Sequence, residues 1–254
     1  GTFYAVHIDE VKKIAALPDF KGYIMDIGGA TANMYGIECP RKLKSGACKN
    51  KRCLYPGICS NLKIDHSRQI NLLKNLRKIK GVKKVFVASG IRYDLLLGDK
   101  QHRAEYMREL IAHHISGQLK VAPEHVAPEI LKRMGKPASR LLLDFKNMFD
   151  ELNQSLRKNQ FLTYYFMAAH PGCTRDDMRL IKAFAGKELH INPRQVQIFT
   201  PLPSTYSALM YFTESDPFTR KKIFVEKNLR GKQHQKDLLT DRHTIRKQAR
   251  KVSW

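Results

Sequence analysis

The feature that most narrows the possible folds is a regular alternation of short apolar segments with longer amphipathic ones. The short segments have the length of strands, whereas the long ones repeat apolar residues at helical spacing. The connections leave no room for hairpins, so the strands should run parallel in an α/β fold. Strands are expected at 23–27, 82–88, 118–122, 161–168 and 195–199, and helices at 65–80, 103–115, 128–134, 140–158 and 175–186.

Glycine, proline and polar residues follow each expected strand directly. Helices come next, so these positions are carboxyl ends of parallel strands, where barrels and open α/β sheets build their binding sites. Five such motifs at equivalent positions indicate a functional site rather than coincidence. They are Gly28-Gly29, Ser89-Gly-Ile-Arg92, Pro123-Glu-His125, His170-Pro-Gly-Cys173 and Thr200-Pro-Leu-Pro-Ser204.

Each motif also has a purely structural interpretation, which the residues leave open. The alternatives are a tight turn at Gly28-Gly29, a surface ion pair between Arg92 and Asp94, a helix cap at Glu124-His125, a turn at Pro171-Gly172 and simple burial of Cys173. The pair His113-His114, on an expected helix, is expected to face solvent.

Four of the five cysteines lie in one loop, residues 38–61, which is rich in Lys and Gly. They are Cys39, Cys48, Cys53 and Cys59. Thiolates are ligands of zinc and of iron–sulfur clusters. The spacing Cys-x8-Cys-x4-Cys-x5-Cys is not that of zinc ribbons, so it does not name the metal. The sequence predicts one metal centre at these four positions, zinc or iron–sulfur, without Cys173. Reduced thiols, or one or two disulfides, are the alternative.

The chain carries 46 Lys and Arg against 23 Asp and Glu, a net charge of +23. Such an excess attracts polyanions, nucleic acids included. Part of the charge lies between residues 220 and 251, which we expect to be a solvated helix or a disordered extension. A nucleic-acid-binding arm is the more specific interpretation of that stretch.

The length suits one large domain, and no apolar run approaches the roughly 20 residues that span a bilayer. There is no secretory signal, and the cysteine number is odd, so a reducing, cytoplasmic location is expected. The chain does not begin with Met, which suggests a fragment or a processed form.

Taken together, several segments resemble the radical S-adenosylmethionine (SAM) superfamily, and within it the YgiQ family. The resemblance extends from about residue 3 to residue 227. Its most specific part is Asp26-Ile-Gly-Gly-Ala-Thr-Ala-Asn-Met-Tyr-Gly36 together with the four-cysteine loop. The other segments are 19–22, Ser89-Gly-Ile-Arg-Tyr-Asp94, Lys120-Val-Ala-Pro-Glu-His125, Leu131-Lys-Arg-Met-Gly-Lys136, 197–205 and 210–213.

The resemblance implies a partial (β/α)6 barrel that holds a 4Fe–4S cluster and SAM. In such enzymes the reduced cluster cleaves SAM to a 5′-deoxyadenosyl radical, which abstracts hydrogen from a substrate; the sequence does not name that substrate. By the same resemblance, Gly28-Gly29 would receive the SAM amino group and Ser89–Arg92 would lie near the ribose and carboxylate. Glu124-His125 would also contact SAM, and Pro171-Gly172 would hold the adenine.

Two departures from that family pattern are informative. The superfamily's Cys-x3-Cys-x2-Cys motif is missing, so the first barrel strand and its cluster ligands would lie upstream of Gly1. We therefore expect residues 1–213 to form a barrel without its first strand, with 23–27 at an exposed edge, and 214–254 to form a basic extension. This chain alone should not cleave SAM. In addition, the glycine motif reads Gly-Gly-Ala rather than Gly-Gly-Glu, so an acceptor for the SAM amino group must come from elsewhere.

Two competing hypotheses remain open at this stage. A zinc-stabilised, basic RNA-binding protein would explain the charge and the cysteines but not the five strand-end motifs. An RNA methylthiotransferase is suggested by 131–136 and 200–205, but the stretch after Thr213 is too short for the β-rich RNA-binding domain of that group.

Overall fold

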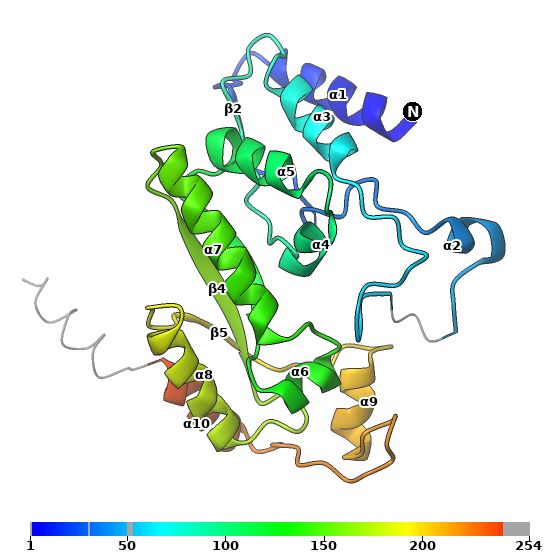
Figure 1. Cartoon of the computed structure of the whole chain (residues 1–254), viewed down its shortest axis with the longest axis vertical. Coiled ribbons are helices and arrows are strands. Elements are labelled where there is room, and N and C mark those ends of the chain that lie inside the picture. The colour runs from blue at the N-terminus through cyan, green and yellow to red at the C-terminus, as the bar shows by residue number, and fades with distance from the viewer. Residues whose placement is uncertain (1, 30, 50–52, 241–254) are drawn as a thin grey trace, which may run out of the picture. The chain divides into compact units, whose positions relative to one another are not determined.

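A computed structural model describes residues 2–29, 31–49 and 53–240 of the chain, shown in Figure 1. Internal contacts divide the chain into two compact units, which are described separately. Unit 1 comprises Gly1–Cys53, Gly57–Ala122 and Leu141–Thr163. Unit 2 comprises Leu54–Pro56, Pro123–Arg140 and Tyr164–Trp254.

Unit 1 begins its sheet with two short parallel strands, β1 (Tyr23–Ile24) and β2 (Lys84–Val85). Tyr23 pairs with Lys84, and the Ile27 amide extends the ladder by donating to the Phe86 carbonyl at 2.9 Å. Beyond β2, Ile91 forms a parallel bridge with Val121 of β3 (Gln118–Glu124). The parallel segments of unit 1 therefore lie side by side in the same order in which they occur along the chain.

Helices α1 (Thr2–Ala15) and α3 (Ser67–Leu76) lie side by side in unit 1 (Figure 1). The apolar residues of α3 recur at helical spacing, so one face of the helix is buried. Leu72 and Leu76 on that face pack with Val11 of α1 and Val85 of β2. Burial of such a stripe is what stabilises a helix of ten residues in a protein.

The other helices of unit 1 differ in how much they bury. α4 (Tyr93–Gly98), α5 (Arg103–Glu109) and α7 (Ser139–Ser155) all contribute buried side chains; the first two residues of α7 fall in unit 2. α5 continues as a π-helical turn, η1 (Leu110–His114). By contrast, α2 (Pro40–Ser45) buries no residue and extends away from the other helices of its unit (Figure 1).

β4 (Phe161–Ala168) lies between β3 and β5 (Gln195–Ile198) in a three-stranded sheet, and it runs parallel to β5 with Ala168 opposite Ile198. α8 (Arg175–Lys187) begins with a capping box between Thr174 and Asp177. α10 (Leu229–Leu239) packs against α8. The remaining helices are α6 (Pro128–Met134) and α9 (Tyr206–Thr213).

All five strands predicted from the sequence are present, and the prediction of an α/β fold with parallel strands is confirmed. The described residues form one two-stranded and one three-stranded sheet, and no closed barrel is found among them. β1 has a single strand neighbour in the described part of the chain, and Tyr23 and Met25 are 49% and 68% exposed. The division at residue 213 stays a prediction.

The basic stretch after residue 220 is partly buried where it is described. Lys232, Gln235 and Leu239 of α10 are buried, so this part of the stretch is not the solvated helix that the sequence suggested. Its amphipathic character was hidden by the surrounding charge. The prediction for residues 241–254 lies outside the described residues. Among the helices that are described, none has the length and apolar content needed to cross a membrane.

Candidate cofactor site

The turn after β1 is organised by the carboxylate of Asp26. It accepts hydrogen bonds from the Gly28 amide at 2.8 Å, from the Ala88 amide at 3.0 Å and from the Ser89 hydroxyl. Burial alone would raise the pKa of Asp26, but these hydrogen bonds together lower it. A Cβ atom on Gly28 would lie 2.8 Å from Cβ of Ser89, so only glycine fits at this position.

A cavity of about 250 Å³ lies beside this turn, lined among others by Gly28, Gly29 and Gln69. A Cβ built on Gly29 meets no described atom within 4 Å, so the backbone there is open to a ligand. The amide of Gln69 donates from Nε2 to the Ala32 carbonyl at 2.6 Å. Its Oε1 is buried, and no described residue donates to it. A residue that lines the cavity therefore carries a buried acceptor to which no described residue donates.

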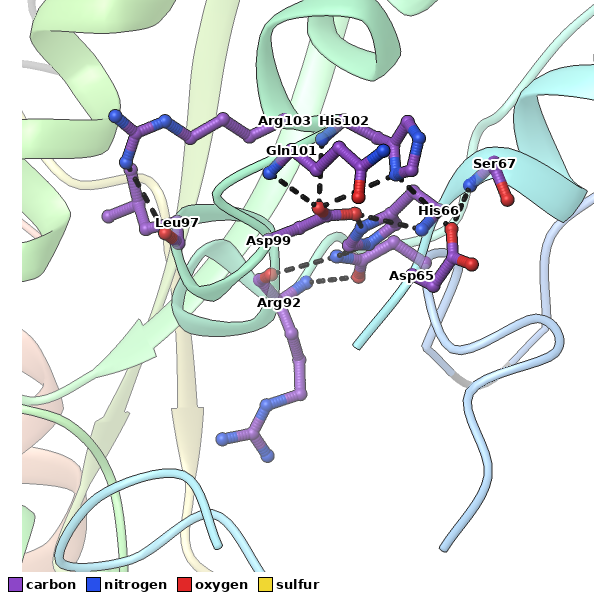
Figure 2. A network of polar contacts seen from close by, with 10 residues as sticks. Asp65, His66, Ser67, Arg92, Leu97, Asp99, Gln101, His102 and Arg103 are labelled. Atoms are coloured by element: carbon purple, nitrogen blue, oxygen red, sulfur yellow. Dashed lines mark hydrogen bonds and ion pairs between the residues drawn. The ribbon is translucent and has the colours of Figure 1, made fainter. Parts of the chain in front are cut away.

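A buried network holds the backbone of Arg92 (Figure 2). Asn33 accepts from the Arg92 amide at 2.8 Å and donates to the Arg92 carbonyl at 2.9 Å, so its orientation is fixed. The same Nδ2 group lies 3.3 Å from Nε2 of His66, which therefore accepts. His66 must then donate from Nδ1 to Asp99, 2.8 Å away. The imidazole is neutral, and its burial lowers its pKa although Asp99 opposes the shift.

Asp99 is 2% exposed and ties this network to the turn before α5. Besides the His66 ring it accepts from the amides of His66 and His102, each at 2.8 Å, and of Gln101 at 3.2 Å. Burial alone would raise the pKa of Asp99, but these bonds together lower it. Asp65, Asp99 and His102 also bring three potential metal-ligand atoms within 4.8 Å of one another. The hydrogen bonds and the 3.2 Å contact between His102 and Asp65 account for this cluster without an ion.

The side chain of Arg92 extends away from the network in Figure 2. Its Nε lies 3.0 Å from a carboxylate oxygen of Asp94, a residue that is 5% exposed. The ion pair between Arg92 and Asp94, which was the purely structural explanation of this motif, is therefore present. It is largely buried and does not lie on the surface. The Arg92 side chain is 24% exposed in this pair.

In unit 2, β3 ends at a residue with unusual backbone geometry. Glu124 has φ +64°, a left-handed conformation that costs a non-glycine residue roughly 1–2 kcal/mol. Its carboxylate lies 2.8 Å from Nζ of Lys136. Such strain is common at functional sites, because the surrounding structure must hold it. Glu124 does not cap α6, whose N-cap is Ala127.

His125 is buried and has a fixed tautomer. Its Nδ1 accepts from the amides of Val126 and Ala127, each at 2.9 Å, so Nε2 carries the proton. Nε2 faces the Cys173 sulfur at 3.5 Å. Burial lowers the pKa of His125 to about 4 and raises the pKa of Cys173 to about 12. Neutral imidazole and protonated thiol make this a structural pair rather than a nucleophile and base.

The motif after β4 repeats the strained geometry. Ala169, directly after the strand, has φ +59°, and Gly172 has φ +89°. Gly172 donates from its amide to the Phe224 carbonyl at 2.7 Å. His170 bonds the Ser207 hydroxyl at 2.8 Å, and burial lowers its pKa to about 4. Pro171-Gly172 therefore forms a turn that is held on both sides by hydrogen bonds.

The four clustered cysteines are not gathered in the structure. Within the described residues, no three of the sulfur atoms of Cys39, Cys48, Cys53 and Cys59 lie within 4.8 Å of one another, and all are free thiols. The metal centre stays a prediction.

The structure brings the predicted residues together in small groups. Ser89 bonds the turn that holds Gly28 and Gly29, and the two glycines line its cavity, while Arg92 lies in the buried network of the same unit. The other predicted residues, Glu124, His125, Pro171 and Gly172, lie in unit 2. The sequence analysis missed Gln69 and His66. Gln69 carried a signal, because it falls on the apolar face of α3 with Leu72 and Leu73.

These features define an α/β protein with parallel strands. No protein-family model matches the chain. The chain is 55% identical over 94% of its length to a UPF0313 protein of Fusobacterium nucleatum subsp. nucleatum, and 44% identical over 91% to UPF0313 proteins of Clostridium perfringens and Clostridium botulinum. It spans 42%, 35% and 36% of those relatives, respectively. Over nearly all of its own length, the chain is therefore similar to a segment of these UPF0313 proteins.

Proposed function

We propose that this chain is the SAM-binding segment of a radical SAM enzyme. The observation that carries the proposal is the cavity beside Gly28-Gly29, which Gln69 also lines; the buried Oε1 of Gln69 has no donor among the described residues. The motif resemblance from Asp26 to Gly36 supports it independently. The substrate is not identified by these residues. The cytoplasmic location and a nucleic-acid contact of the basic extension stay predictions.

The cavity suits the amino-acid end of SAM. Its volume of about 250 Å³ lies below the roughly 300–1,000 Å³ typical of whole-ligand pockets, so it would hold part of the molecule. An ammonium group needs acceptors, and a buried carbonyl oxygen without a donor is costly until one arrives. We propose that Gln69 and the carbonyl groups of the glycine turn receive that ammonium group. Gln69 thereby takes the place of the glutamate missing from the Gly-Gly-Ala sequence.

The 4Fe–4S cluster of such enzymes does not fit this chain, because the Cys-x3-Cys-x2-Cys sequence is lacking. When bound, cluster and SAM together supply the 5′-deoxyadenosyl radical. The residues present here bind and orient: Asp26 fixes the turn, Asn33 fixes the Arg92 backbone, and Gly29 leaves room for close approach. We therefore assign binding, and no radical step, to this chain.

Titration calorimetry with SAM tests the assignment. Gln69→Leu keeps the volume of the side chain but removes the acceptor, and should weaken SAM binding at least tenfold. Gln154→Leu is the matched control, because Gln154 is exposed on α7. Equal affinity in Gln69→Leu and the unmodified chain would sink the proposed binding mode.

The reaction class is tested on a longer protein that contains this segment and an upstream Cys-x3-Cys-x2-Cys sequence. Reduced anaerobically, it should form 5′-deoxyadenosine from SAM, whereas the 254-residue chain reconstituted with iron and sulfide should not. Formation by the short chain contradicts the assignment of the cluster ligands upstream. Failure of the long, cluster-loaded protein contradicts the reaction class.

A further inference from the structure

The four-cysteine loop lacks an apolar core. Among its described residues from 38 to 63, none is buried, and Leu43 on α2 is 71% exposed. A six-residue helix such as α2 has too few internal hydrogen bonds to persist without packing. Loops longer than about 12–15 residues are usually functional or unstructured. Something other than apolar burial must therefore hold this segment if it is to be ordered.

The two ends of the loop, both in unit 1, are paired with each other. Glu38 and Lys63 form an antiparallel bridge, and the Lys63 amide donates to the Glu38 carbonyl at 3.3 Å. Inside the loop, the Cys59 amide donates to the Cys53 carbonyl at 2.8 Å. This hydrogen bond keeps the backbones of these two cysteines close together. The amide side chain of Asn61 points at the Cys59 sulfur, 3.8 Å away. Because the two ends of the loop are paired, the cysteines between them have a shorter distance to move before the four sulfur atoms can meet.

The charge of the loop suits a thiolate site. From 38 to 63 the sequence holds one acid, Glu38, and seven basic residues: Arg41, Lys42, Lys44, Lys49, Lys51, Arg52 and Lys63. Four thiolates around a divalent ion leave a net charge of −2, which nearby cations stabilise. A disulfide, by contrast, gains nothing from such charge, and all four cysteines are free thiols.

We propose that Cys39, Cys48, Cys53 and Cys59 bind one thiophilic metal centre, and that binding draws their four sulfur atoms together. Zinc–sulfur bonds of ~2.3 Å require sulfur atoms about 3.8 Å apart, closer than the arrangement described above. Each thiol releases its proton to solvent and contributes a lone pair to the metal. Metal binding and ordering of the loop are therefore one event. This inference is independent of the proposed SAM site.

Zinc and an iron–sulfur cluster share this ligand chemistry, and loading distinguishes them. The chain is incubated anaerobically either with Zn²⁺ alone or with ferrous iron, sulfide and thiol, and is then desalted. One equivalent of zinc without colour identifies the first. Iron with acid-labile sulfide, and visible absorption that dithionite bleaches, identifies the second. A chain that retains neither overturns the proposal.

Two double variants and one control assign the ligands. Cys39→Ser with Cys48→Ser, and Cys53→Ser with Cys59→Ser, should each lower the metal content at least tenfold. Their far-UV circular dichroism should not change, because the loop buries nothing. Cys173→Ala removes the one buried thiol and should keep full metal content. Unaltered metal content in either double variant contradicts the proposal.

Limited trypsin digestion tests whether metal binding protects the described part of the loop. The loop offers cleavage sites at Lys42, Lys44 and Lys49. Metal-loaded chain should be cut there at least tenfold more slowly than chelator-treated chain, while cleavage at sites of α10 stays unchanged. Equal cleavage with and without metal shows that the metal does not order the loop, and that result contradicts the coupling.

Discussion

Replacement of Asp99 by alanine should destabilise unit 1 far more than replacement of the exposed Asp65. The change leaves two donors of the fully buried His66, its amide and Nδ1, without an acceptor. Each unpaired buried donor costs about 1–3 kcal/mol, so these two cost about 2–6 kcal/mol. Loss of the bonds to His102 and Gln101 frees the turn before α5, for about 1 kcal/mol more. Since such losses are not additive, we expect about 3–5 kcal/mol.

Urea unfolding followed by far-UV circular dichroism measures this free energy. Asp99→Asn keeps one acceptor of two and should lose about 1–3 kcal/mol. Asp65→Ala is the control, because that carboxylate is 53% exposed and its pairing with His102 should be worth about 0–1 kcal/mol. If Asp99→Ala costs no more than Asp65→Ala, the network does not stabilise the fold and the hydrogen-bond argument is wrong.

Three further changes should have measurable effects. Gly28→Ala should cost about 1–3 kcal/mol in urea unfolding and weaken SAM binding at least tenfold, because the new methyl group overlaps Ser89; unchanged stability speaks against the tight turn. Gly172→Ala, at φ +89°, should lower stability by about 1–2 kcal/mol, again by urea unfolding. Acidification should destabilise the chain. His125 and His170 have folded-state pKa values of about 4, below the unfolded value near 6.5. Their stabilising contribution is full above pH 6.5 and is lost towards pH 4, which amounts to roughly 2–3 kcal/mol for each histidine. Replacing both histidines with glutamine should make the melting temperature less dependent on pH over that range.

Strand positions and the parallel arrangement were predictable because they depend on local composition and on the length of the connections. α6 was predictable to the residue, since Pro128 opens it and Gly135, in the left-handed conformation, closes it. Both signals act within a few positions along the chain. The glycine turn was predictable for the same reason.

The buried network was not predictable, because its members are joined only by the fold. Asn33 meets His66 across 33 positions and meets Arg92 across 59, and no local pattern marks either pair. The acceptor on Gln69 was concealed in the same way, although its place on an apolar face was visible. Sequence reasoning locates strand ends, but it cannot tell which polar side chains the tertiary structure leaves without partners.

The expectation that His113-His114 faces solvent was wrong for His114, and η1 is the reason. His114 is fully buried, and its ring lies 2.6 Å from the Val85 carbonyl and 3.1 Å from Glu109. Glu109 and His114 are five positions apart, a spacing that a π-helical turn brings together and an α-helix does not. The extra residue of the π-helical turn changes the direction in which the next side chain points. Deleting one residue from η1 before His114 would restore regular α-helical bonding, yet it would rotate the His114 side chain by about 100° about the helix axis. The helix would become more regular, and the Val85 carbonyl of β2 would lose its hydrogen bond to His114.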